Sequence, residues 1–135
     1  MIQAIAKGVF SVTLNALPLW DGAALLTSLG RRSIDKSFTG DLVAHSVGEM
    51  LSAGGVVSGS AGYVAIERVS GTLAGLKGSF SLLHTGLMNR GEPFLSIVVV
   101  PDSGEGALTG LSGTMTIQIK DGQHFYSFDY ALPQG

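Results

Sequence analysis

Two ionisable residues, Glu67 and His84, lie in neighbouring segments whose alternation would turn both side chains into the protein. Glu67 shares a face with Leu73 in segment 63–73, and His84 shares a face with Phe80 in the segment that follows. Successive side chains of a strand point to opposite faces, so inward-facing Leu73 and Phe80 would carry both ionisable groups inward. Burial raises the pKa of a carboxyl and lowers that of an imidazole, while their mutual attraction opposes both shifts. Such a pair is suited to acid–base catalysis near neutral pH.

A structural interpretation of the same residues stays open. A buried glutamate more often satisfies backbone or arginine donors, and a histidine on an apolar face is more often a hydrogen-bonded core residue. Arg68 would point the opposite way from Glu67, which predicts a surface or interface ion pair. Small side chains at alternate positions of segment 41–53 are predicted to face inward, which places His45 and Glu49 outside.

Four aromatic residues on the predicted inward faces are candidate ligand contacts, namely Tyr63, Phe80, Tyr126 and Tyr130. Tyrosine combines an apolar ring with a hydroxyl that can bind a polar group of a ligand, although aromatic residues at alternating positions are more often plain core. Asp129 lies on the face opposite Tyr130 and is predicted to face solvent.

The sequence argues against a metal ion, a nucleotide or another cofactor. It has no cysteine, and its three histidines lack the spacing of a metal site. The Gly-rich stretch at 103–106 lacks the lysine of a phosphate-binding loop, and no serine-nucleophile motif is present. We therefore expect no metal and no cofactor.

The candidate residues belong to eight predicted strands, because hydrophobic residues recur with a period of two along most of the chain. The strands are predicted at residues 5–14, 32–38, 41–53, 62–73, 76–88, 94–100, 114–120 and 124–132. Segment 94–100 is apolar on both faces, which predicts burial on two sides. Residues 17–30 form the longest irregular stretch, in which 22–29 could form a short helical turn. Sequential hairpins of this kind predict one all-β domain over residues 1–135, a closed eight-stranded antiparallel up-and-down β-barrel.

The composition indicates an oligomer rather than a nucleic-acid or membrane protein. Only 13% of the 135 residues are charged, and the mean hydropathy is +0.39. Val64, Ile66 and the apolar sixth strand would leave hydrophobic patches outside the barrel, so we expect a homo-oligomer. The net charge is −2 and the basic residues are scattered, which argues against nucleic acid. Because no signal peptide or long apolar run is visible, we expect no membrane association and a cytoplasmic location.

Several segments together resemble the bacterial domain of unknown function 3224 family, in order and at similar spacing. They are residues 36–41 (KSFTGD), 63–73 (YVAIERVSGTL), 78–86 (GSFSLLHTG), 99–106 (VVPDSGEG) and 126–130 (YSFDY). The resemblance extends from Phe38 to Tyr130 and implies a barrel similar to those of allene oxide cyclase and dirigent proteins. The glycine run from Gly104 to Gly113 is similar to a dirigent motif. The resemblance implies no established activity, and a shared fold does not by itself give a function.

Three functions remain open at this point. The first is a barrel that binds a largely apolar small molecule through one open end. The second is an isomerase or cyclase in which Glu67 and His84 assist proton transfer. The third is a structural or interaction protein whose barrel is filled by its own side chains, and the volume of any internal cavity separates this function from the other two.

Overall fold

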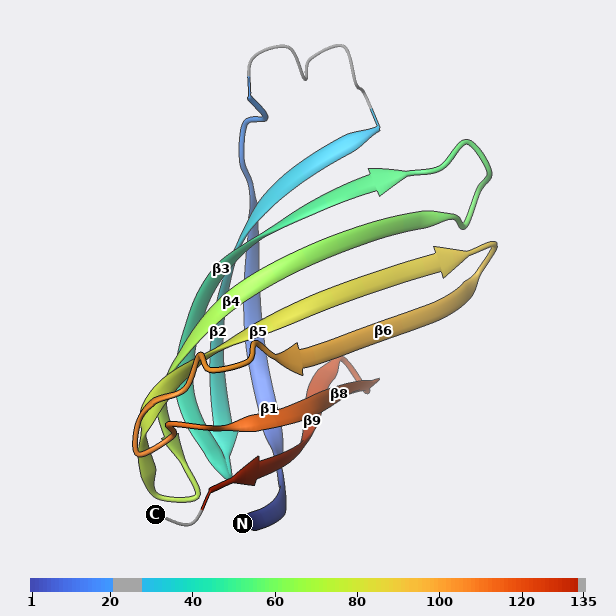
Figure 1. The fold of residues 1–135 in the computed structure, drawn as a ribbon. Coiled ribbons are helices and arrows are strands. Elements are labelled where there is room, and N and C mark those ends of the chain that lie inside the picture. The colour runs from blue at the N-terminus through green and yellow to red at the C-terminus, as the bar shows by residue number, and fades with distance from the viewer. Residues whose placement is uncertain (21–27, 134–135) are drawn as a thin grey trace.

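The protein forms a closed ring of eight antiparallel strands with one short strand outside the ring (Figure 1). This is a computed structural model, and it describes residues 1–20 and 28–133. The strands are β1 Ile2–Ala16, β2 Leu29–Gly40, β3 Leu42–Gly54, β4 Ala61–Leu73, β5 Leu76–Asn89, β6 Glu92–Val99, β7 Glu105–Gly106, β8 Ser112–Lys120 and β9 Gln123–Leu132. The predicted all-β barrel is therefore confirmed.

Sequential hairpins build most of the wall, and two further pairings close it. Strands β1 to β6 pair each with the next, β8 pairs with β9, and β9 returns to β1 along Ile2↔Leu132 to Phe10↔His124. The last pairing, β6 with β8, holds over two residue pairs, Ile97↔Met115 and Val98↔Thr114. The wall is continuous, but this junction is its shortest.

The strand boundaries differ from the predicted ones mainly in length. β1 begins at Ile2 and ends at Ala16, and β2 begins at Leu29, inside the stretch predicted to be irregular. The short strand β7 was not predicted. The helical turn predicted at 22–29 falls mostly on residues 21–27, which lie outside the described residues. In the described ranges no helix has the length and hydropathy needed to cross a membrane.

One end of the barrel, at the turn between β4 and β5, is filled by side chains. The rings of Phe80 and Phe128 stack with their centroids 5.7 Å apart, and both residues are fully buried. Leu108 and Leu111, from the connection between β6 and β8, are also buried in this core. Close packing of this kind supplies most of the free energy of folding in a small domain. We call this half the closed end.

The Tyr126 side chain connects strands at the closed end through hydrogen bonds to the backbone. Its hydroxyl donates a hydrogen bond to the carbonyl oxygen of Thr39 at 2.7 Å and accepts one from the backbone N–H of Leu42 at 2.9 Å. The ring reaches this position because residue 8 is glycine: a Cβ there would lie 2.6 Å from the tyrosine hydroxyl. The turn between β2 and β3 is thereby fixed to β9.

The opposite end, at the β3–β4 and β5–β6 turns, is not filled. Leu14, Met88, Leu95 and Ile119 have inward-facing positions by strand alternation, yet 41–66% of each residue is exposed. Farther along the same faces, Phe10 and Ile97 are buried. The inner wall is thus open to solvent at this end, which we call the open end.

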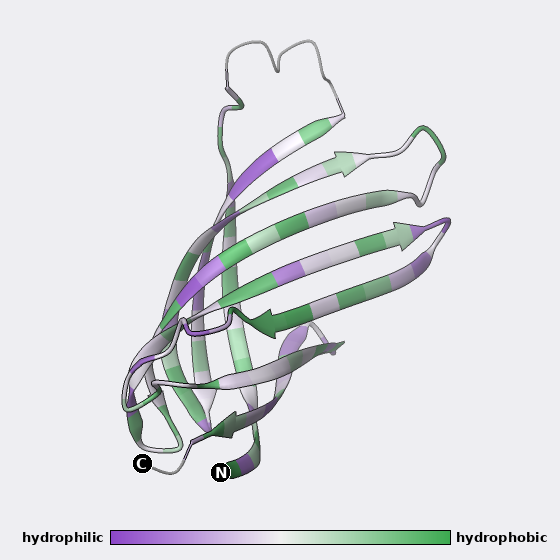
Figure 2. Cartoon of the chain, in the orientation of Figure 1, coloured by the Kyte–Doolittle hydropathy of each residue, from purple (hydrophilic) through white to green (hydrophobic). Residues whose placement is uncertain are grey.

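The prediction for the sixth strand is wrong for its outer face. Ile97 and Val99 point inward and are buried, but Phe94 is 56% exposed on the outside. The strand is hydrophobic along much of its length (Figure 2), and the outward-facing Val98 is only partly buried. Its composition therefore reflects an outer surface that is not fully covered.

Candidate functional site

A buried carboxylate, Glu67, lies at the boundary between the filled and the open half of the barrel. Its side chain is fully buried, and it receives one side chain from each of three neighbouring strands. Ser46 on β3 donates to Oε1 at 2.7 Å. Lys36 on β2 and His84 on β5 both contact Oε2, at 2.8 Å and 2.5 Å. We call these four residues the Glu67 cluster.

Strand register explains why the cluster forms. Lys36 pairs directly with Ser46, and Gly48 lies opposite Glu67 on the same ladder. A Cβ at residue 48 would come within 2.0 Å of the Ile66 carbonyl oxygen, so glycine lets β3 approach β4 closely beside the carboxylate. Every second residue of each strand points inward, so four neighbouring strands place four polar groups at one height in the barrel.

Lys36 brings the compensating charge. Its ammonium group lies 4.9 Å from the ring centroid of Phe10 and 5.8 Å from that of Phe38, in addition to its contact with Glu67. Aromatic faces attract a cation, and the ion pair offsets the cost of burying each charge alone. The two charges are therefore held together inside an otherwise apolar wall.

The pKa of Glu67 is lowered from 4.5 to about 2. Burial by itself raises this pKa, but hydrogen bonds from His84 and Lys36 and the charge of Lys36 lower it by more. The carboxyl group is therefore ionised at neutral pH, and its two oxygens already accept three hydrogen bonds. An ionised carboxylate that accepts these three hydrogen bonds holds the side chains of Ser46, Lys36 and His84 in place.

The carboxylate also sets the tautomer of His84. The nitrogen Nε2 faces an ionised oxygen and must carry a proton, so a neutral imidazole has its lone pair on Nδ1. Within residues 1–20 and 28–133, every buried side-chain nitrogen and oxygen has a hydrogen-bond partner. No described residue forms a hydrogen bond with Nδ1, so this atom keeps a small contact with solvent, although His84 as a whole is only 4% exposed.

An apolar hollow of about 320 Å³ lies at the open end, next to the cluster. Its lining includes Met50, Tyr63, Gly86, Met88 and Leu95. Tyr63 and Gly86 form the part of the lining nearest the cluster, because the Tyr63 ring centroid is 6.4 Å from that of His84. The hollow is therefore bounded by methionine and leucine side chains and by one tyrosine beside the imidazole.

Glycine at position 86 decides where the Tyr63 ring lies. A Cβ on Gly86 would be 2.1 Å from Cε1 of Tyr63, so the ring packs directly against the backbone of β5. Burial, and then the negative charge of Glu67, raises the pKa of Tyr63. The hydroxyl thus keeps its proton at neutral pH and can donate a hydrogen bond.

The predicted approach of Glu67 to His84 is confirmed, and so is the inward face of β3. Ser46 is fully buried, whereas His45 and Glu49 are exposed. Lys36 was not among the predicted site residues. A signal was present, because Lys36 alternates with Ile34 and Phe38 and so lies on an apolar face.

The other aromatic candidates lie away from the hollow. Phe80, Tyr126 and Tyr130 are buried in the core of the closed end, and Tyr63 alone of the four predicted ligand contacts lines the hollow. The ligand role of the three buried rings stays a prediction. Asp129 is exposed, as predicted. Among the described residues, no group of three potential metal ligands gathers anywhere.

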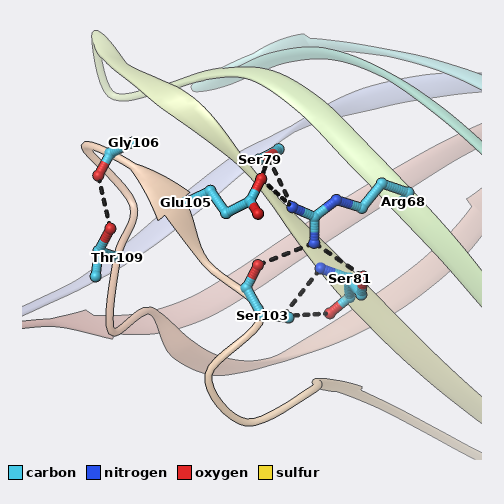
Figure 3. Close-up of polar contacts among 7 residues, drawn as sticks. All are labelled: Arg68, Ser79, Ser81, Ser103, Glu105, Gly106 and Thr109. Carbon is cyan, nitrogen blue, oxygen red and sulfur yellow. Dashed lines mark hydrogen bonds and ion pairs between the residues drawn. The ribbon is translucent and has the colours of Figure 1, made fainter.

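A second polar cluster, around Arg68, lies outside the barrel and has a structural role (Figure 3). The guanidinium donates to Ser79 and Ser81, to the Ser103 carbonyl oxygen, and at 2.8 Å to Glu105. These contacts hold the connection between β6 and β8, which carries Leu108 and Leu111 into the closed end. The surface ion pair predicted for Arg68 is confirmed.

A closed antiparallel barrel, packed at one end and hollow at the other, with an ionised carboxylate at the boundary between them, defines this chain as a small β-barrel protein. Residues 6–130 match the family model described as "Protein of unknown function (DUF3224)", and the chain belongs to this family. The crystal structure of a DUF3224 protein of unknown function from Shewanella oneidensis is similar, with a TM-score of 0.91 and 47% sequence identity over 99% of this chain and 100% of that chain. No curated protein matches the sequence significantly.

Proposed function

We propose that the protein binds a small, largely apolar molecule in the hollow at the open end of the barrel. The observation that carries this proposal is an apolar hollow lined by Tyr63, whose ring centroid lies 6.4 Å from that of the buried His84 imidazole. Small-molecule sites are mostly apolar, with a few fixed polar groups that orient the ligand. At about 320 Å³ the hollow is at the lower end of the usual range of about 300–1,000 Å³.

The polar groups define which head group fits. The Tyr63 hydroxyl donates a hydrogen bond, and a neutral His84 accepts one at Nδ1. A hydroxyl group on the ligand satisfies both at once, because its oxygen accepts from Tyr63 while its proton points to His84. We therefore infer that the ligand is a compact hydrocarbon that carries one hydroxyl.

Fluorescence titration with naphthol and naphthalene tests this function. We expect naphthol to bind roughly tenfold more tightly, because each hydrogen bond contributes about 1 kcal/mol and 1.4 kcal/mol is a factor of ten. Tyr63→Phe should remove most of this preference and leave naphthalene binding unchanged.

Tyr126→Phe is the matched control, since it deletes a tyrosine hydroxyl from the closed end. It should lower the free energy of unfolding by about 1 kcal/mol, through the lost backbone hydrogen bonds, and leave both affinities unchanged. Equal affinity of the wild-type protein for the two compounds, or no binding of either, would overturn the proposal.

A second candidate function is proton transfer at carbon, and the orientation of His84 favours it. The Glu67 carboxylate contacts Nε2 and leaves Nδ1 on the other side of the imidazole, which is the arrangement of a histidine base held by a carboxylate. In such a step Nδ1 removes a proton from the carbon next to a ketone, and the electrons of the C–H bond form an enolate. Tyr63 hydrogen-bonds the enolate oxygen. Where the substrate has a C=C bond beside the deprotonated carbon, the enolate is a dienolate, and return of the proton to the far carbon of that C=C bond shifts the double bond and gives the conjugated isomer. The family resemblance implies a barrel similar to that of allene oxide cyclase, which is a further argument for this candidate at the level of the fold alone.

Hydrogen exchange of tetralone in heavy water tests the second candidate. An enzyme should speed the loss of the protons beside the carbonyl, and His84→Gln should abolish the acceleration. A wild-type protein that binds naphthol without speeding this exchange is a binding protein and not an isomerase of this kind.

A further inference from the structure

The outer surface of strands β3 to β6 carries a continuous hydrophobic patch. Its six main residues are each 37–56% exposed: Val47, Leu51, Val64, Ile66, Leu83 and Phe94. Register places four of them side by side, since Leu51 pairs with Val64 and Ile66 pairs with Leu83. Val47 pairs with Arg68 at one edge, and Phe94 pairs with the exposed Leu87 at another. We call this set the outer patch.

The area of the outer patch is large for a surface that stays in water. Half-exposed side chains of this size leave roughly 100 Å² each accessible, so six present on the order of 600 Å², the upper limit for the largest patch of a typical monomer. A standard interface covers about 800 Å² per partner, of which about 65% is apolar in homodimers. The outer patch therefore supplies the apolar part of one such interface.

Ion pairs border the outer patch on two sides. Arg31 contacts Glu49 at 2.7 Å, and Arg68 contacts Glu105 at 2.8 Å. Glu49 lies opposite Ile66 in the β3–β4 ladder, so the first pair directly adjoins the patch. A hydrophobic centre with a polar rim is the usual anatomy of a protein interface.

The ion pairs at the edge of the outer patch favour a second copy of this chain as the partner. Each ion pair holds one positive and one negative charge, so two copies of this face meet without a net charge on either side. A strongly acidic or basic partner would find no complementary field here. A surface that pairs with itself closes as a twofold dimer.

The patch also contains a hollow that can receive side chains. Its volume is about 610 Å³, and its lining includes Trp20, Leu51, Val64, Ile66 and Leu83. Trp20 is 58% exposed, and Phe94 stands out from the same surface. Exposed aromatic residues beside an apolar recess are typical anchors of an interface.

We propose that the outer patch is the contact surface of a homodimer, in which a second copy of this chain covers Ile66 and its neighbours. This surface faces away from the interior, and the two sites share one residue, Phe94, which lies at the edge of the patch and also lines the hollow at the open end. The proposal stands independently of ligand binding.

Sedimentation velocity at micromolar concentration tests the dimer. We expect the wild-type protein to sediment at twice the 13.9 kDa mass of the chain. Ile66→Lys should convert it to the monomer, because the dimer would have to bury an unpaired charge. Ile5→Lys is the matched control, since Ile5 on β1 is 57% exposed against 55% for Ile66. This variant should remain dimeric.

Circular dichroism establishes that both variants keep the barrel. Should Ile66→Lys not fold, Ile66→Thr provides a second variant, and it should weaken the dimer at least tenfold. A wild-type protein that sediments as a monomer at micromolar concentration would overturn the proposal. This outcome counts against the dimer even if the monomer binds lipid vesicles through the outer patch. A wild-type dimer that survives both substitutions at Ile66 would overturn it as well.

Discussion

The two halves of this barrel have the same wall but different interiors. At the closed end, inward-facing residues such as Phe80 and Phe128 fill the space and are fully buried. At the open end, residues with the same inward alternation, such as Met88 and Leu95, are more than 40% exposed. The difference teaches that alternation determines which way a side chain points, whereas the neighbours across the barrel determine whether it is buried. One half stabilises the fold, and the other leaves part of its inner wall exposed to solvent.

The largest expected difference between the halves is in the cost of removing a side chain. Phe128→Ala should lower the free energy of unfolding by about 3–5 kcal/mol, because it leaves a cavity in a packed core. Leu95→Ala should lower it by less than about 1 kcal/mol, because its side chain already faces water. Urea denaturation of both variants checks this. Similar losses in the two variants would contradict the division into a packed and an open half.

The Glu67 cluster lies at the boundary between the two halves. Removing one of its two charges should lower the free energy of unfolding more than removing both. Glu67→Gln leaves Lys36 buried without its anion and should cost about 3 kcal/mol. The double variant Lys36→Met and Glu67→Leu removes both charges and should recover most of this loss. Urea denaturation of the three proteins measures the difference. A double variant less stable than Glu67→Gln would show that packing, rather than charge, holds the cluster.

Acid should destabilise the protein through the same carboxylate. Because the pKa of Glu67 falls from 4.5 in the unfolded chain to about 2 in the folded one, its contribution is complete above pH 4.5 and is lost as the pH falls toward 2. The loss is on the order of 3 kcal/mol. Thermal melts between pH 6 and pH 2 should therefore show a steeper decline for the wild-type protein than for the double variant. Parallel declines would contradict the lowered pKa.

Much of this architecture could be predicted from the sequence. The period of two and the turn residues predict a barrel of eight strands, and alternation alone brings Glu67 and His84 to the same interior. Lys36 was not predicted as a site residue, although it alternates with Ile34 and Phe38 and therefore lies on an apolar face.

The hollow could not be predicted, because it depends on contacts between distant strands. Phe10 and Leu14 share one face of β1, yet Phe10 packs against Phe38 and is buried, whereas Leu14 is 42% exposed. Burial at these positions depends on strands from elsewhere in the chain. For a similar reason the apolar outer face of β6 predicted a strand buried on both sides, although Phe94 on that face is 56% exposed.

The central claim is that a ligand binds at the open end of the barrel. The methyl groups of the four methionines test this claim most directly, because the four residues lie in different parts of the protein. Met50 and Met88 line the hollow, Met115 lies in the packed core, and Met1 lies at the start of the chain. With methyl-labelled methionine, naphthol should shift the NMR signals of Met50 and Met88 and leave those of Met115 and Met1 in place. Shifts confined to Met115 or Met1, or no shift at saturating naphthol, would contradict a ligand site at the open end.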